Sequence, residues 1–221
     1  DDRLDGGTGN DTLDGGAGDD ILDGGAHGDV MRGGSGNDTY YVDSTSDDVV
    51  EAAGEGQDGV LSSVTYSLAA RAHVENLTLT GSGAVNATGN AAGNVLTGNG
   101  AANVITGGGG ADVLTGGGGA DRFDFNAILE SAVGQGVRDV IADFVHLVDV
   151  VDLATIDANT LVSGNQVFTW KDTAALTGAG QAHIVYTATG AIIEGDVDGG
   201  GADFQIELLG VDLVTVADIV R

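Results

Sequence analysis

The sequence predicts an all-β fold, a right-handed parallel β-roll in two blocks that is followed by an all-β C-terminal cap domain. Three observations predict it. A nine-residue period is written four times from Gly6 and four times again from Gly89. Glycine fills much of the first six places of the period, and an apolar side chain stands at the eighth place of every copy. A unit this short cannot bury a core alone, so the copies must stack on one another.

Each unit divides into a turn and a short strand. The first block reads GGTGNDTLD, GGAGDDILD, GGAHGDVMR and GGSGNDTYY. Glycines in the turn permit the positive-φ conformations that a tight turn with inward-facing carbonyls requires. The last three residues would form a strand whose central side chain points inward, so two units make one coil around a narrow core. The eighth-place residues are Leu13, Leu22, Met31, Tyr40, Leu96, Ile105, Leu114 and Phe123.

The sixth place of every unit carries a carboxylate or an amide. These residues are Asp11, Asp20, Asp29, Asp38, Asn94, Asn103, Asp112 and Asp121. Turns eighteen residues apart would stack, which sets Asp11 over Asp29 on one edge and Asp20 over Asp38 on the other. Carboxylates at a sheet spacing of roughly 4.8 Å repel unless a cation lies between them. Oxygen-only ligands, flexible turns and the absence of Cys favour Ca²⁺ over Zn²⁺. Mg²⁺ usually keeps several waters and does not accept an all-protein cage, so we expect several bound Ca²⁺ ions.

The repeats resemble the RTX (repeats-in-toxin) family, whose signature is GGxGxDxUx with U a large apolar residue. Three of the first four copies match it fully. The resemblance implies that backbone carbonyls of the second and fourth places join the carboxylates. The expected metal ligands are Gly7, Gly9, Asp11, Gly16, Gly18, Asp20, Asp29 and Asp38 in the first block, and Gly108, Gly110, Asp112 and Asp121 in the second. A disordered Gly/Asp-rich linker, the alternative, would not keep an apolar residue at every eighth place.

Two departures from the signature are informative. His27 takes the fourth place of the third copy, where we expect a tolerated substitution and not a ligand. The next turn on that edge has Asp47 at its sixth place but no glycine pair, so we expect the metal ladder to end there.

The second block contains neutral residues at two sixth places. We expect weaker or absent Ca²⁺ where Asn94 faces Asp112 and where Asn103 faces Asp121. Amide hydrogen bonds should carry part of the stacking at these positions.

The chain has 34 acidic and 7 basic residues, a net charge of −27. This charge opposes collapse without counterions and argues against nucleic acid and anionic lipid as partners. The sequence opens inside a repeat, with Asp2 and Leu4 already at the sixth and eighth places, so we expect a fragment with an upstream domain. No run of about 20 apolar residues is present to span a membrane.

The chain is expected to divide into four segments: a first roll over 1–43, a β-rich connector over 44–80, a second roll over 81–124 and a cap over 125–221. In the cap, residues 188–190 predict a hairpin, and Phe204, Ile206 and Leu208 alternate as a strand.

The cap resembles the C-terminal secretion domain of serralysin-type proteins through the segments RDVIADF, VDLATIDAN, GNQVFTW, GAGQAHIVY and GDVDGGGADFQIELLG. The resemblance implies export through a type I ABC transporter with an uncleaved C-terminal signal, an acid followed by apolar residues. Asp218, Ile219 and Val220 match that pattern, and Arg221 departs from it.

A further loop in the cap places carboxylates at alternate positions. Asp196, Asp198 and Asp203 in GDVDGGGAD are a candidate metal site, with a solvated turn as the alternative.

No catalytic motif is found. The four His residues form no H-E-x-x-H, and no G-x-S-x-G occurs, so we expect no catalysis within these residues. The function expected is a calcium-binding module that drives calcium-triggered folding, stability and type I secretion of an exported, extracellular bacterial protein. One alternative is an accessory C-terminal domain of a secreted metalloprotease or lipase. The other is an extracellular carbohydrate- or surface-binding module.

Overall fold

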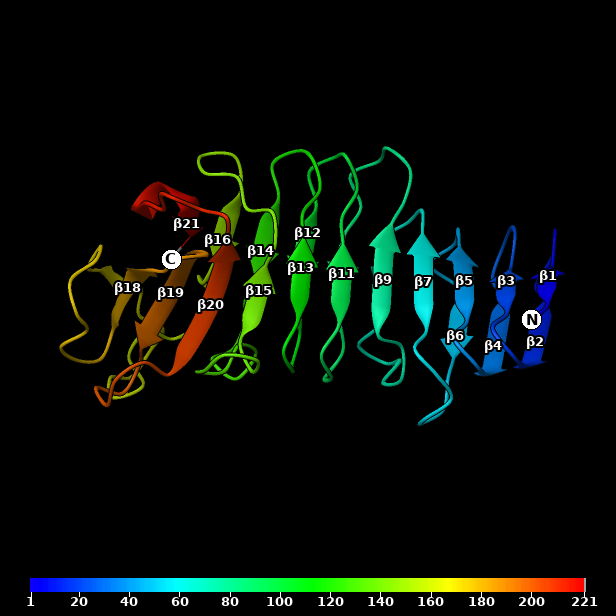
Figure 1. Cartoon of the computed structure of the whole chain (residues 1–221), viewed down its shortest axis with the longest axis horizontal. Helices are drawn as coiled ribbons and strands as arrows, with labels where there is room; N and C mark the ends of the chain where they lie inside the picture. Colours follow the sequence, from blue (N-terminus) through cyan, green and yellow to red (C-terminus); the bar gives the residue numbers. More distant parts are fainter. Residues whose placement is uncertain (221) are drawn as a thin grey trace.

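Short parallel strands stack along the long axis of the protein, and successive strands alternate between two faces (Figure 1). The structure, a computed structural model, describes residues 1–220. One face is a single twelve-stranded sheet that runs the whole length. In spatial order its strands are β1 (Arg3–Asp5), β3 (Ile21–Asp23), β5 (Thr39–Val42), β7 (Gly59–Ser62), β9 (Asn76–Leu79), β11 (Val95–Thr97), β13 (Val113–Thr115), β15 (Asp139–Ile141), β20 (Phe204–Leu209), β19 (Gly190–Asp196), β18 (Gln181–Tyr186) and β17 (Thr169–Trp170).

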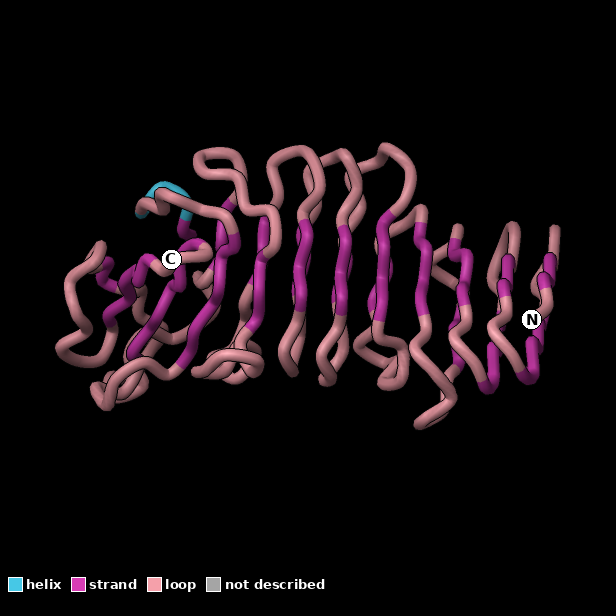
Figure 2. The backbone as a smooth tube through the Cα atoms, in the orientation of Figure 1, coloured by secondary structure: helices cyan, strands magenta, loops and turns pink. Residues whose placement is uncertain are grey.

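The opposite face consists of two shorter sheets. The first contains β2 (Thr12–Ala17), β4 (Val30–Ser35) and β6 (Asp48–Val50). The second contains β8 (Tyr66–Ser67), β10 (Ala87–Thr88), β12 (Val104–Thr106), β14 (Arg122–Asp124), β16 (Val150–Asp152) and β21 (Ile219–Val220). The strands are short and the connecting turns long, as Figure 2 shows. A single 3₁₀ turn, η1 (Val216–Asp218), is the only helical element among residues 1–220. The predicted all-β parallel roll is confirmed.

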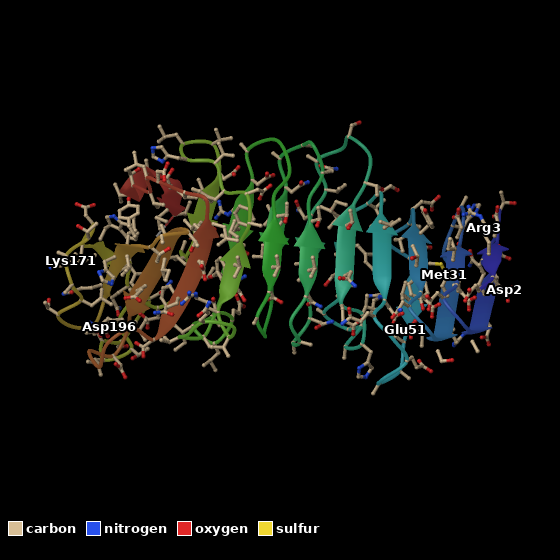
Figure 3. All side chains as sticks on the ribbon, viewed as in Figure 1. Asp2, Arg3, Met31, Glu51, Lys171 and Asp196 are labelled. Carbon is tan, nitrogen blue, oxygen red and sulfur yellow. The ribbon has the colours of Figure 1, made fainter. Side chains whose placement is uncertain are left out.

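The register of the strands follows the sequence period. Within the first block Thr12 pairs with Val30, and within the second Val95 pairs with Val113, eighteen residues apart in both cases. Every eighth-place side chain lies in the core between the faces, with at most 5% of its surface exposed. Met31, for example, is fully buried between the two sheets (Figure 3). The expected narrow core is therefore present.

Through residues 44–80 only one of the two faces is a continuous sheet. β7 pairs with β5 and β9 with β7, so the long sheet is unbroken, whereas β6 and β8 belong to different sheets. Two side chains bridge this break. The Tyr66 hydroxyl and the Arg71 guanidinium both donate to the Asp47 carbonyl, at 3.3 and 3.2 Å, and the guanidinium lies 4.7 Å from the centre of the Tyr66 ring.

The C-terminal segment closes the far end of the roll. β20 adds to β15 and β21 adds to β16, so both faces are extended by strands from the end of the chain. β18 and β19 are antiparallel up to the pair Tyr186 and Ala191, which confirms the hairpin predicted at 188–190. Phe204, Ile206 and Leu208 are buried and alternate with more exposed residues, as expected for this strand. No helix among residues 1–220 is long and apolar enough to cross a membrane.

Candidate calcium sites along the edges of the roll

Acidic and amide side chains line the two edges where turns lead into strands. The long-sheet edge comprises the residues at the start of the long-sheet strands: Asp2, Asp20, Asp38, Asp58, Glu75, Asn94, Asp112 and Asp139. The opposite edge comprises the residues that precede strands of the other face: Asp11, Asp29, Asp47, Asn103, Asp121 and Asp149. The stacking of Asp11 with Asp29 and of Asp20 with Asp38 agrees with the period.

One oxygen of each carboxylate holds the stack together. The Oδ1 atom of Asp38 accepts the backbone amide of Asp20 at 2.7 Å, and Oδ1 of Asp58 accepts the amide of Asp38 at 2.8 Å. The same bond recurs along both edges, from the amides of Asp2, Asp11, Asp29, Asn94, Asn103, Asp112 and Asp121 to the next coil. Each side chain that accepts such a bond is thereby fixed in position by a neighbouring coil.

The second oxygen of most of these carboxylates has no partner. Buried Oδ2 atoms without a hydrogen bond among the described residues belong to Asp11, Asp20, Asp29, Asp38, Asp58, Asp112 and Asp139. A buried acceptor left unsatisfied costs about 1–3 kcal/mol, and more when it is charged. Two carboxylates about 4.8 Å apart also repel by about 3–4 kcal/mol at an effective dielectric constant of about 20. A cation between successive coils removes both costs, so the residues present fit Ca²⁺.

Burial also raises the pKa values of several of these acids. It raises the pKa of Asp112 and Asp121 to about 6 and that of Asp139 to about 8. It also raises the pKa of Asp38 and Asp47, to which the neighbouring charges of Asp20 and Asp29 add. The fold therefore disfavours the ionised carboxylates unless a counter-charge is supplied.

The glycines of the turns have the backbone conformation that the sequence predicts. Gly7, Gly9, Gly16, Gly18, Gly108 and Gly110 all have φ between 83° and 129°. One contact shows why a side chain is not tolerated next to them: a Cβ on Gly34 would lie 2.2 Å from the Gly16 carbonyl oxygen. The coils thus approach closely enough for carbonyls and carboxylates to share an ion. That these carbonyls are ligands stays a prediction; the Gly7 carbonyl also accepts the Ala26 amide at 2.9 Å.

Asparagine continues the stack in the second block without adding charge. The Asn94 side-chain amide donates to the carbonyls of Val74 and Glu75, at 3.1 and 3.3 Å. Asn103 donates to the Val85 carbonyl at 2.6 Å. The expectation that amide hydrogen bonds carry part of the stacking is confirmed. Reduced calcium binding at these positions stays a prediction.

On the opposite edge, Asp47 differs from Asp11 and Asp29 because both of its carboxylate oxygens accept hydrogen bonds. Its Oδ1 accepts the Asp29 amide at 3.1 Å, and its Oδ2 accepts the amides of Asp43 and Ser44. Because both oxygens are satisfied, the run of unpartnered oxygens in the first block ends at Asp29 on this edge. His27 is exposed and has a φ of 96°, a conformation that favours glycine.

The Asp196 loop lies toward the opposite end of the roll from Glu51 (Figure 3). The structure brings Asp196, Asp198 and Asp203 together, with ligand atoms within 4.8 Å of one another. Their oxygens already serve the turn: Asp196 accepts the Gly199 amide at 2.6 Å, and Asp203 accepts the Val197 amide at 2.7 Å. Metal binding here stays a prediction.

Four members of the edges lie outside the nine-residue period and were not among the expected ligands: Asp58, Glu75, Asp139 and Asp149. A shorter signal identifies them. An acid followed by any residue and then a buried apolar residue occurs in Asp58-Gly-Val60, Glu75-Asn-Leu77, Asp139-Val-Ile141 and Asp149-Val-Val151. This triplet survives where the glycines of the repeat are lost.

The residues expected to form a secretion signal lie inside the fold. Asp218 is fully buried and accepts the Leu147 and Thr215 amides at 2.8 and 2.6 Å, and its carboxylate lies 2.8 Å from Nδ1 of His146. Burial raises the pKa of Asp218, but these hydrogen bonds outweigh it and lower the pKa overall. Ile219 and Val220 form β21, and Arg221 lies outside the described residues.

Known proteins were compared with the chain in three ways. Among solved structures, the solution structure of the AlgE6R3 subunit from the Azotobacter vinelandii mannuronan C5-epimerase matches with 20% identity, 96% coverage of this chain, 80% coverage of that chain and a TM-score of 0.37. No curated protein matches. The family of RTX calcium-binding nonapeptide repeats (4 copies) matches residues 1–30, 28–49 and 88–123. These segments are calcium-binding repeats of the RTX family.

Proposed function

We propose that calcium binding drives the folding of this module, and that the module confers calcium-triggered folding, stability and type I secretion on an exported bacterial protein. The observation that carries the proposal is the row of buried Oδ2 atoms without partners along both edges. Except at Asp11, each is held in place by the Oδ1 bond of the same side chain. The stack therefore needs several cations to be stable at neutral pH, and the net charge of −27 adds to this need.

The concentration of calcium would decide which form exists. Extracellular calcium modules have dissociation constants of about 0.1–1 mM, far above the calcium level inside a cell. The chain would remain unfolded before export and would fold in the extracellular medium. The roll blocks 1–43 and 81–124 would bind the ions, the connector 44–80 would join them, and 125–221 would close the end.

The position of the C-terminal residues supports export before folding. Asp218 is buried and Ile219 and Val220 are paired with β16, so a transporter could engage them only in the unfolded chain. We infer that an ABC transporter is the partner during export and that an upstream domain of the same polypeptide is its cargo.

A calcium titration tests the folding step. Far-UV circular dichroism of the metal-free chain should show little β-structure, and added Ca²⁺ should restore it in a cooperative transition. Mg²⁺ at the same concentration is the control and should act weakly, because it retains its waters. If metal-free and calcium-loaded samples gave the same spectrum and the same melting temperature, the proposal would be wrong.

A fusion experiment tests the secretion step. A reporter joined to the N-terminus of this chain should reach the medium from a bacterium that has a type I transporter, and should stay inside an otherwise identical strain without it. Equal amounts of reporter in both media would contradict the secretion role and leave the folding role standing.

A further inference from the structure

The turn after β6 stacks on the last glycine-rich turn of the first block, although it lies outside the residues that match the repeat family. It runs from residue 51 to residue 58, eight residues, where the turn below it, 33–38, has six. Three hydrogen bonds hold the two turns in register. The Gly36 amide donates to the Glu55 carbonyl at 2.7 Å, the Gln57 amide to Asn37 Oδ1 at 2.8 Å, and the Asp38 amide to Asp58 Oδ1 at 2.8 Å.

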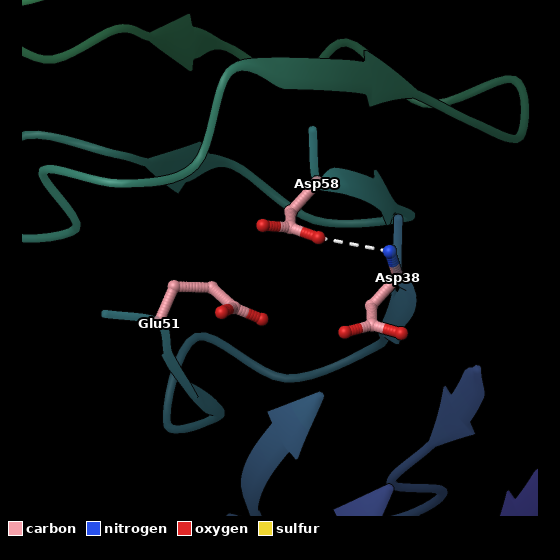
Figure 4. A group of neighbouring side chains, drawn as sticks. All are labelled: Asp38, Glu51 and Asp58. Carbon is pink, nitrogen blue, oxygen red and sulfur yellow. Dashed lines mark hydrogen bonds between the residues drawn. The ribbon is translucent and has the colours of Figure 1, made fainter. Parts of the chain in front are cut away.

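Three carboxylates converge between these turns, as Figure 4 shows. Asp38, Glu51 and Asp58 each offer an oxygen within 4.8 Å of the others. Asp38 and Asp58 are 1% exposed, so this space is inside the fold. Oδ2 of Asp38, Oε2 of Glu51 and Oδ2 of Asp58 are buried without a hydrogen-bond partner among residues 1–220.

The remaining oxygen of each carboxylate is fixed by a neighbour. Asp38 accepts the Asp20 amide at 2.7 Å, and Asp58 accepts the Asp38 amide. Glu51 accepts the Tyr40 hydroxyl, which itself accepts the Gly33 amide at 2.7 Å. The three carboxylates are therefore held close to one another before any ligand arrives.

No basic side chain among the described residues forms an ion pair with this cluster. Arg32 lines an outer hollow with Asp14, Glu51 and Glu55, but no ion pair joins it to Glu51 among residues 1–220. Burial raises the pKa of Glu51 to about 8 and that of Asp58 to about 6, in agreement with a missing counter-charge. The hollow gives a hydrated cation a way to reach Glu51 from solvent.

We propose that Asp38, Glu51 and Asp58 form an additional calcium site, in which a glutamate side chain supplies the ligand that a glycine turn would supply through its backbone. Hard carboxylate oxygens at this spacing suit Ca²⁺, with water completing the shell through the hollow. The site rests on the proposed function, since it assumes that the stacked carboxylates hold calcium, and it adds an ion at the end of the first block that the nine-residue signature does not specify.

Native mass spectrometry of the full chain in Ca²⁺ tests this site by counting ions. Glu51→Gln keeps an acceptor for Tyr40 and removes one ligand charge, so it should bind one ion fewer than the unsubstituted chain. Asp14→Asn is the matched control: it removes a charge from the same hollow, but Asp14 is exposed and not part of the cluster, so the ion count should not change.

The possible outcomes distinguish failure of this site from failure of the proposed function. An unchanged ion count and calcium midpoint in Glu51→Gln would overturn this site and leave the proposed function intact. An unsubstituted chain that binds no calcium would overturn both. Should Glu51→Gln fail to fold in calcium, Glu51→Asp keeps the charge and shortens its reach. In Glu51→Asp the dissociation constant of the ion at this site should rise about tenfold. An unchanged dissociation constant would overturn the site.

Discussion

Asp38 bonds to the Asp20 amide through Oδ1 at 2.7 Å and leaves its Oδ2 buried without a partner. One side chain thus aligns two coils and also creates the need for a cation between them. The two roles can be separated by experiment, because asparagine keeps an oxygen acceptor for the amide and removes the charge.

The first prediction concerns the position of an acid within the ladder. Asp20→Asn should raise the calcium midpoint of the circular dichroism transition by about tenfold, or ~1.4 kcal/mol. Asp121→Asn should raise it less. Asp20 is buried next to Asp38 and has an unpartnered Oδ2, whereas Asp121 faces neutral Asn103 and is not among the unpartnered oxygens. Equal shifts in the two variants would contradict a ladder of shared ions.

The second prediction concerns pH in the absence of metal. Burial raises the pKa of Asp112 to about 6 and that of Asp139 to about 8. Such carboxyls stabilise the fold when protonated. Their contribution is complete below the unfolded pKa of about 4 and is lost as pH rises through about 6 and then about 8. The metal-free chain should therefore show more β-structure by circular dichroism at about pH 5 than at about pH 8.5.

Saturating calcium should reverse this pH dependence, because the ions bind the deprotonated carboxylates and compete with protons. Asp218 serves as an internal reference: its pKa is lowered, so its contribution to stability is constant above about pH 4. If the β-structure of the metal-free chain increased with pH, burial of these acids would not limit the stability of the roll.

The third prediction adds a charge where the second block lacks one. Asn94→Asp should bind an additional calcium ion in native mass spectrometry, because a carboxylate would then face Asp112 across the coil. Without calcium, at about pH 5 where the metal-free chain is expected to be most ordered, the same variant should be less stable by about 1–3 kcal/mol, since the donors to the Val74 and Glu75 carbonyls are lost. Chemical denaturation with and without Ca²⁺ measures the stability of the variant in the two states. Greater stability of the variant without calcium would contradict this account of the asparagine contacts.

The sequence predicts the roll well because its period fixes several features at once. An eighteen-residue spacing sets the register of Thr12 with Val30, and the eighth place sets the core side chains such as Met31. The same period stacks the sixth-place acids. Local turn chemistry, strand register and burial all point to one structure here, which is why sequence reasoning succeeds.

Sequence reasoning missed the members of the edges that lie beyond the repeats. Glu51 is brought to Asp38 by a turn two residues longer than a repeat turn, and no periodic pattern places it there. Asp139 reaches the edge after the loop that follows β14, whose length the sequence does not reveal. These positions depend on coil stacking, which becomes visible only when the register of each strand is known.

The last prediction concerns the backbone strain at His27. This residue occupies a glycine place with φ at 96°, and its side chain is exposed, with Nδ1 2.7 Å from the Ala26 carbonyl oxygen. His27→Gly should stabilise the calcium-loaded roll by about 1 kcal/mol, because glycine adopts positive φ without a Cβ clash. His27→Ala is the matched control, since it removes the ring and keeps the Cβ, and it should leave the stability nearly unchanged. Denaturation in saturating Ca²⁺ compares the two. If alanine stabilised the roll as much as glycine, the ring and not the backbone would be the source of the strain.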